Sequence, residues 1–127
     1  MATIKVSDLS GSALDWCVAE CEGATSELDG KGADNCWLEF EINCTYLSTY
    51  SPSSDWDQGG PIIEREKICI EPHKSQDGVW IAGILGDWPK NWFNHALSAE
   101  SPLIAAMRCY VASKLGDEVE VPDELVS

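Results

Sequence analysis

The apolar residues of this chain recur with two different periods, and each period predicts a different kind of element. Near the N-terminus the spacing is i, i+3, i+4 and i+7, which places the apolar residues on one face of a helix: Leu14, Cys17, Val18 and Cys21. Ser10 precedes this segment as a typical N-cap residue, and Gly23 follows it as a typical helix terminator. The pattern therefore predicts a helix over residues 10–23.

A second helical pattern lies near the C-terminus. The segment PLIAAMRCYVASKL begins at Pro102, directly after the capping residue Ser101, and Gly116 follows its last residue. Its apolar face consists of Leu103, Ile104, Met107, Tyr110, Val111 and Leu115. We expect a helix over residues 102–115 and a flexible acidic tail from about residue 117.

Between these helices the pattern changes to alternation, which is typical of strands. Residues 36–47, CWLEFEINCTYL, predict one half-buried strand. Its inward face would carry Leu38, Phe40, Ile42 and Cys44. Segments 67–71 and 79–84 predict a hairpin around a Gln-Asp-Gly turn, whereas 24–35 and 86–100 are predicted to be loops.

Together these elements predict a single α+β domain over residues 1–127. A small antiparallel sheet of three to four strands would pack with the N-terminal and C-terminal helices in a sandwich, so that each apolar face is covered. No apolar run approaches the roughly 20 residues of a membrane span, and the N-terminus lacks the basic and apolar regions of a signal peptide. We therefore expect a soluble intracellular protein that does not bind a membrane.

The net charge further narrows the range of possible functions. Eight Lys and Arg residues against 22 Asp and Glu residues give a net charge of −14. Binding to nucleic acid depends on clustered cations that contact phosphates, so this composition excludes general DNA or RNA binding. Two interpretations remain open. The acidic surface either keeps the protein soluble, or docks on a basic, nucleic-acid-binding protein.

The residues that usually carry chemistry form no recognisable motif. The six cysteines include no C-x2-C pair and no histidine at ligand spacing, so we predict buried free thiols and no metal site. Neither His73 nor His95 belongs to a recognised sequence arrangement of nucleophile, histidine and carboxylate. A phosphate-binding glycine loop, a dinucleotide fingerprint and an HExxH motif are all missing from the sequence. We therefore predict that the protein is not an enzyme and that it needs no cofactor.

One segment, SSDWDQGGP at residues 53–61, fits no ordinary packing element. Its simplest interpretation is a single turn capped by a serine and stopped by the Gly-Gly pair. The same geometry also suits the rim of a pocket, because free N–H groups and a glycine backbone can meet the oxygens of a ligand while an indole stacks on it. The predicted ligand-binding residues are Ser53, Ser54, Asp55, Trp56, Gln58, Gly59, Gly60, Arg65, Trp88, Trp92 and Arg108.

Three blocks of the sequence resemble a known family. ALDWCVAECEG, YSPSSDWDQGGPIIERE and SPLIAAMRCYVASKLGDEVEVP are similar to the NinX-type family of bacteriophage and prophage proteins, a domain of unknown function. The order of elements is more remotely similar to the phage α-β-α sandwich domain. The resemblance implies a phage accessory protein that acts in the cytoplasm of an infected bacterium.

Small phage proteins of this kind act mostly by binding, and two hypotheses follow. In the first, the protein sequesters a small nucleotide-like immune signal in a pocket and so counters bacterial anti-phage defence. In the second, it is an acidic interaction module that binds and inhibits a host protein. The sequence leaves open whether the protein forms a homo-oligomer.

Overall fold

The computed structural model describes residues 1–28, 32–85 and 93–126. Short 3-10 turns connect several of the elements. In chain order, the strands and helices are β1 (Ala2–Lys5), α1 (Gly11–Cys21), β2 (Thr25–Leu28), β3 (Cys36–Glu39), β4 (Cys44–Tyr46), α2 (Trp56–Glu66), β5 (Ile68–Pro72), β6 (Trp80–Leu85), β7 (Phe93–Ala99), α3 (Pro102–Leu115) and β8 (Glu118–Val121). The predicted α+β class is confirmed, but the strands form three small sheets instead of one.

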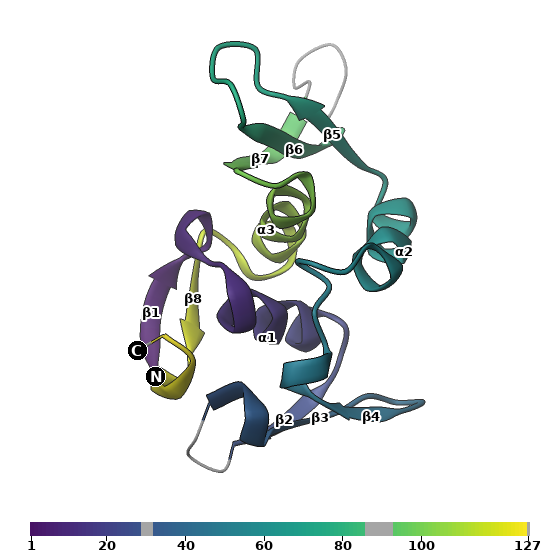
Figure 1. Ribbon diagram of the computed structural model, residues 1–127, viewed down its shortest axis with the longest axis vertical. Coiled ribbons are helices and arrows are strands. Elements are labelled where there is room, and N and C mark those ends of the chain that lie inside the picture. The colour runs from purple at the N-terminus through teal and green to yellow at the C-terminus, as the bar shows by residue number, and fades with distance from the viewer. Residues whose placement is uncertain (29–31, 86–92, 127) are drawn as a thin grey trace.

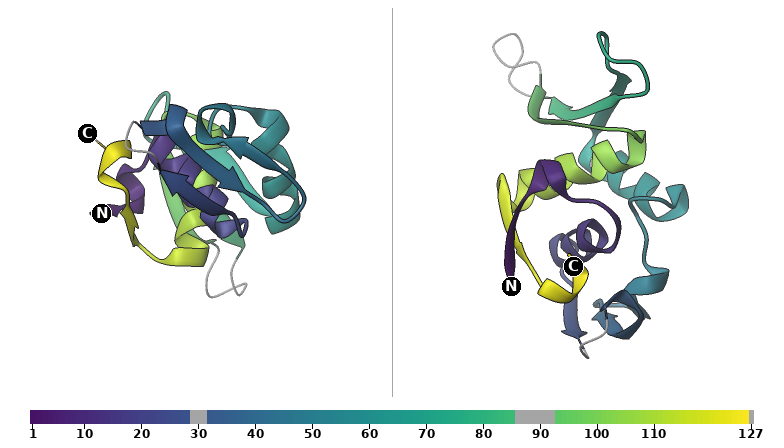
Figure 2. Two further views of the ribbon diagram at one scale, coloured as in Figure 1. Left: turned by 90° about the horizontal axis from the view of Figure 1, so that it is seen from below. Right: turned by 60° about the vertical axis from the view of Figure 1, so that its left-hand side comes forward.

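The elements are stacked in layers along the long axis of the molecule. The antiparallel sheet β5-β6-β7 lies at one end, α3 packs beneath it, α1 follows, and the antiparallel sheet β2-β3-β4 closes the other end. Helix α2 flanks α3 on one side, and the two-stranded ribbon of β1 and β8 lies on the other (Figures 1 and 2). Each sheet therefore has a face turned away from the helices.

Helix α3 forms the centre of the core. Eight of its 14 residues are buried, which is more than one face of a helix can supply. The sequence predicts this helix with the observed bounds, and the Ser101 hydroxyl accepts the expected capping hydrogen bond from the N–H of Ile104 at 3.4 Å. Because α3 has sheet β5-β6-β7 on one side and α1 and α2 on others, its small alanines are buried along with its large residues.

The other helix and the hairpin that the sequence predicts are also present. Helix α1 covers most of residues 10–23, and Gly23 follows it in a left-handed conformation with a φ of 89°. Strands β5 and β6 pair in antiparallel register from Ile68 opposite Ile84 to Pro72 opposite Trp80. In both cases the local pattern agrees with the tertiary packing.

The prediction of a single strand over residues 36–47 is wrong. The chain turns back at residues 40–43, where the N–H of Phe40 donates to the carbonyl of Asn43 at 2.8 Å, and the two halves pair as β3 and β4. Ile42 lies in this turn with 91% of its surface exposed, and Cys44 is also exposed. Alternation is preserved on both sides of a tight turn, so it does not reveal where a long strand folds into a hairpin.

Three segments predicted to be irregular contain strands. Residues 24–35 contain β2, residues 86–100 contain β7, and the acidic tail expected to be flexible from about residue 117 begins with β8. Strand β8 pairs with β1, from Ala2 opposite Val121 to Lys5 opposite Glu118, and buries Val119 and Val121. Pairing with a distant partner orders these strands, and the local sequence does not contain that information.

All six cysteines are free; Cys17, Cys36 and Cys109 are buried, as expected of small apolar side chains, whereas Cys44 is exposed. Among the described residues, no helix has both the length and the apolar character that crossing a bilayer requires.

Candidate functional site

The segment SSDWDQGGP leads into α2 and forms its first half. The N-cap is Asp55, and not a serine as predicted; its Oδ1 accepts a hydrogen bond from the N–H of Asp57 at 2.9 Å. The Gly-Gly pair was predicted to stop the turn, but Gly59 and Gly60 lie inside the helix, which continues to Glu66. The packing of α2 against the rest of the core outweighs the low helix propensity of these residues.

Most polar groups of this segment hold the chain in place. The backbone N–H of buried Ser53 donates to Oδ1 of Asp15 in α1 at 2.9 Å. Gln58 in α2 accepts from the N–H of Ser51 at 2.7 Å and donates to the carbonyl of Thr49 at 3.2 Å. These bonds join the loop before α2 to both α1 and α2, so the segment has a clear structural role.

The two glycines differ in what surrounds them. A Cβ atom on Gly59 would lie 2.4 Å from the carbonyl oxygen of Pro52 and 2.6 Å from Cδ1 of Leu103 in α3. Around Gly60 the corresponding space is open. Gly59 thus allows α2, α3 and the preceding loop to approach closely, whereas Gly60 makes no such contact.

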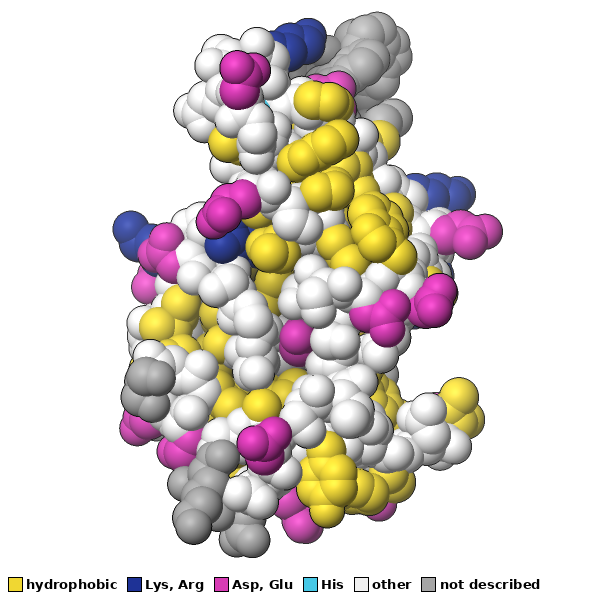
Figure 3. Space-filling view, viewed as in Figure 1, with side chains coloured by type: hydrophobic (Ala, Val, Ile, Leu, Met, Phe, Trp, Pro, Cys, Tyr) yellow, Lys and Arg dark blue, Asp and Glu magenta, His cyan; other side chains and the backbone are white. Residues whose placement is uncertain are grey.

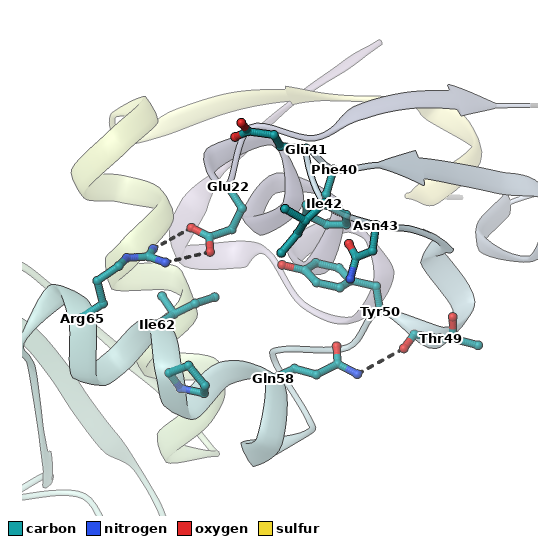
Figure 4. A pocket seen from close by; sticks show the side chains of 11 residues that line it. Glu22, Phe40, Glu41, Ile42, Asn43, Thr49, Tyr50, Gln58, Ile62 and Arg65 are labelled. Atoms are coloured by element: carbon teal, nitrogen blue, oxygen red, sulfur yellow. Dashed lines mark hydrogen bonds and ion pairs between the residues drawn. The ribbon is translucent and has the colours of Figure 1, made fainter.

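A groove opens between α2 and the turn that joins β3 to β4 (Figure 4). It has a volume of about 590 Å³ and is lined by Glu22, Phe40, Glu41, Ile42, Asn43, Thr49, Tyr50, Gln58, Pro61, Ile62 and Arg65. Phe40 and Tyr50 form a tilted aromatic pair with ring centroids 5.1 Å apart. The groove combines apolar and aromatic side chains with several polar groups, a composition typical of binding sites.

An ion-pair network lies at one end of this groove and joins the three helices. The guanidinium of Arg65 in α2 makes a bidentate pair with Glu22, which directly follows α1, at 3.0 Å from Nη1 and 2.6 Å from Nη2. Its Nε donates to Glu66 at 2.8 Å, and Nη2 also donates to the hydroxyl of Tyr110 in α3 at 3.1 Å. Lys114 in α3 completes the network with a contact of 3.4 Å to Glu66.

The network shifts the pKa values of its members. Burial raises the pKa of Glu22, but hydrogen bonds from Arg65 and Tyr110 outweigh burial and hold this pKa below its ordinary value. The hydrogen bond from Arg65 is also the main reason that the pKa of Glu66 is lowered. Burial, and then the hydrogen bond donated to Glu22, raises the pKa of Tyr110. At neutral pH, therefore, the carboxylates are ionised and the phenol keeps its proton.

The electrostatics of the groove follow from this network. Arg65 is the one cation among its lining residues, and two carboxylates within 3 Å already neutralise it. Of the two carboxylates in the lining, Glu22 pairs with Arg65, and Glu41 carries the remaining negative charge. The groove therefore presents an acidic rim next to an apolar floor.

The predicted ligand-binding residues are only partly brought together. Gln58 and Arg65 line the groove. The others of the segment surround the start of α2, where Trp56 is 54% exposed. Arg108 lies elsewhere: its Nε donates to the carbonyl of Leu9 at 2.7 Å and its Nη1 to that of Ser98 at 2.9 Å. Trp88 and Trp92 lie outside the described residues. Ligand binding by any of these residues stays a prediction.

Sequence reasoning missed most of the groove. Phe40 was expected on the inward face of a strand, and Glu22 and Tyr50 received no role. These residues come from three separate segments that meet only in the folded chain, so no local signal marks them. The described residues also contain no cluster of three His, Cys, Asp or Glu side chains placed to hold a metal ion.

Comparison with known proteins places the chain in a family. None of the curated proteins compared with the chain matches it. A family model described as Bacteriophage P22, NinX matches residues 5–114, which extend from β1 to the last turn of α3. This range includes every residue that lines the groove. The chain therefore belongs to the NinX family of bacteriophage P22.

Proposed function

We propose that this phage accessory protein acts in the cytoplasm of the infected bacterium by binding a host protein, and that the groove between α2 and the β3–β4 turn is its binding site. A segment of the partner would place an apolar side chain on the aromatic floor and basic groups near the acidic rim. The protein would act by occupying a surface that the host protein needs.

The exposure of Ile42 is the observation that carries this proposal. Ile42 stands at the edge of the groove with 91% of its surface in water, next to Phe40 and Tyr50. Burying an isoleucine side chain is worth roughly 2 kcal/mol. A partner that covers Ile42 would gain this free energy without any need to rearrange the groove.

The charge of the protein supports a basic partner. The chain carries a net charge of −14, and on the face shown in Figure 3 acidic side chains outnumber the few Lys and Arg side chains. Complementary charge speeds association and disfavours acidic competitors, even where it adds little to the affinity.

The second candidate is a small nucleotide-like ligand, an immune signal whose capture would counter bacterial defence. The groove volume of about 590 Å³ and the meeting of Gln58 and Arg65 in it favour this candidate. The phosphates of such a ligand would have to compete with Glu22 and Glu66 for the guanidinium of Arg65. For this reason we rank it below a protein partner.

Capture from infected cells tests both candidates. A tagged wild-type protein would be compared with Ile42→Ser in the groove and with Leu115→Ser, which removes another exposed aliphatic side chain (39% exposed) far from it in sequence. Mass spectrometry would identify proteins in the eluate and nucleotides released by heating. We expect one host protein that Ile42→Ser fails to capture, that Leu115→Ser retains, and that dissociates at high ionic strength.

Two other results would change the conclusion. A nucleotide released by the wild type but not by Ile42→Ser would assign the groove to a small ligand. Equal capture of the same molecules by all three proteins would exclude the groove as the binding site.

A further inference from the structure

We propose that the outer face of sheet β2-β3-β4 is a second interaction surface, and that it binds an arginine-bearing, basic segment of a partner protein. This surface adjoins the groove, which lies on the α2 side of the β3–β4 turn, and Glu41 of that turn borders both. The inference rests on the strand register and stands whether or not the groove holds a ligand.

The register determines which residues share the outer face. Glu27, Trp37 and Tyr46 lie opposite one another across the three strands, and Thr25, Glu39 and Cys44 form the next row. The alternate positions of the middle strand, Cys36 and Leu38, are buried on the other face, in the core. The six outer residues therefore point away from the helices.

An aromatic pair occupies the middle of this face. The rings of Trp37 and Tyr46 meet edge to face with centroids 4.9 Å apart, and Tyr46 is 49% exposed. In such an arrangement one ring uses only its edge, so the two faces of that ring remain uncovered by its partner. Hydrophobic side chains are visible at this end of the molecule in Figure 3.

Carboxylates lie beside the aromatic pair. Glu27 in β2 lies directly opposite Trp37 in β3. Glu39 lies two residues beyond Trp37 in β3, and both glutamates are exposed. The residues of the three strands, TSEL, CWLE and CTY, include no Lys or Arg. Glu41, in the turn that follows β3, lies at the end of this face. A shallow hollow there is lined by residues that include Thr25, Glu39, Glu41 and Cys44.

This combination selects the chemistry of the partner. A guanidinium stacks on an aromatic face and at the same time forms a two-pronged pair with a carboxylate, whereas an ammonium is more strongly hydrated and does not stack. The negative charge disfavours nucleic acid, which would otherwise suit an exposed aromatic sheet. An arginine side chain between Trp37 or Tyr46 and a glutamate satisfies both features.

Peptides of equal charge test this inference on the full-length protein. The probes are (Arg-Gly)4 and (Lys-Gly)4, titrated into 15N-labelled protein at low and at physiological salt. We expect the arginine peptide to bind at least threefold more tightly than the lysine peptide, and to shift the amide signals of β2, β3 and β4. The preference for arginine should persist at physiological salt, because stacking is screened less than charge attraction.

Variants separate the roles of ring and charge. Tyr46→Ser is expected to weaken binding of the arginine peptide by about threefold to tenfold, whereas Tyr46→Phe, which keeps the ring, should bind like the wild type. The pair Glu27→Gln and Glu39→Gln should weaken binding, while the pair Glu71→Gln and Glu118→Gln, which removes two exposed glutamates from other sheets, should not. Because all four glutamates are exposed, these variants are expected to fold.

Three results would overturn the inference. Equal binding of both peptides with equal weakening by the two glutamine pairs would indicate general attraction to an acidic protein. Shifts confined to Tyr50, Gln58 and Ile62 would assign the peptide to the groove, which would support the proposed function and exclude this surface. Absence of binding at millimolar peptide and low salt would exclude the surface as well.

Discussion

The carboxylate of Asp15 in α1 accepts a 2.9 Å hydrogen bond from the backbone N–H of Ser53, 38 residues further along the chain, and both residues are buried. This bond joins α1 to the segment that leads into α2. A buried carboxylate with few partners is costly to ionise. Burial raises the pKa of Asp15 from its ordinary value of 3.8 to about 6, although the hydroxyl and the N–H of Ser53 partly oppose this shift.

The first prediction concerns the pH dependence of stability. Between about pH 4 and pH 6 the folded protein keeps the proton on Asp15 while the unfolded chain has lost it, so the contribution of Asp15 to the free energy of unfolding falls as pH rises through this range. Asp15→Asn removes the titration and keeps an acceptor for Ser53. The stability of Asp15→Asn relative to the wild type should rise by up to roughly 3 kcal/mol from pH 4 to pH 7.

Urea denaturation of both proteins at one-unit intervals from pH 4 to pH 8 measures this difference. The comparison cancels the other titrating groups, because they are common to the two proteins. A constant difference over the whole range would show that Asp15 does not titrate in it.

The second prediction uses the two adjacent glycines of α2 as a matched pair. Gly59→Ala should destabilise the protein by about 1–3 kcal/mol, because its Cβ would meet the carbonyl oxygen of Pro52 at 2.4 Å and Cδ1 of Leu103 at 2.6 Å. Gly60→Ala should be neutral or stabilising by up to about 1 kcal/mol, because the space is open and alanine favours a helix. Thermal and urea unfolding measure both; equal effects would contradict the close packing at Gly59.

The third prediction concerns the network at the end of the groove. Arg65→Gln should cost about 1 kcal/mol, a small value because Arg65 is half exposed. Arg65→Lys should recover little of this loss, because an ammonium does not reproduce the bidentate pair with Glu22. A double-mutant cycle of Arg65→Gln with Glu22→Gln measures the coupling; a coupling of zero would mean that the pair does not contribute to stability.

The fourth prediction tests whether the acidic tail is part of the fold. Val121 in β8 is fully buried, and Val121→Ala should destabilise the protein by roughly 1–3 kcal/mol. Glu120→Ala, at the neighbouring exposed position of the same strand, is the control and should have little effect. If Val121→Ala unfolds at the same urea concentration as the wild type, β8 does not contribute to the core.

Much of the helical structure could be predicted from the sequence, because both periodicity and end signals are local. Ser101, Pro102 and Gly116 bound α3 correctly. The hairpin of β5 and β6 followed from two short apolar segments around a turn. In contrast, the segments of β7 and β8 were predicted to be a loop and a flexible tail, although the EVEV of β8 alternates. Pairing with β6 and β1 orders them as strands.

The candidate site was predictable only in small part. Gln58 lies in the unusual segment 53–61 and Arg65 follows it closely, so both were recognised, and both line the groove. Arg108 was assigned to that site as a further cation, although its guanidinium donates to the carbonyls of Leu9 and Ser98. A guanidinium reaches whatever the fold brings near it, and sequence distance does not indicate what that will be.

By itself the sequence determined the α+β class, the positions of α1 and α3, the NinX family and the strongly acidic charge, because each depends on local pattern or on composition. Only the tertiary structure decided that the alternating segment 36–47 folds into a hairpin and leaves Ile42 in water, and that Glu22, Arg65 and Tyr110 meet. The physical reason is that these features arise from contacts between residues far apart in the chain, whose free energies exceed the local preferences of the residues involved.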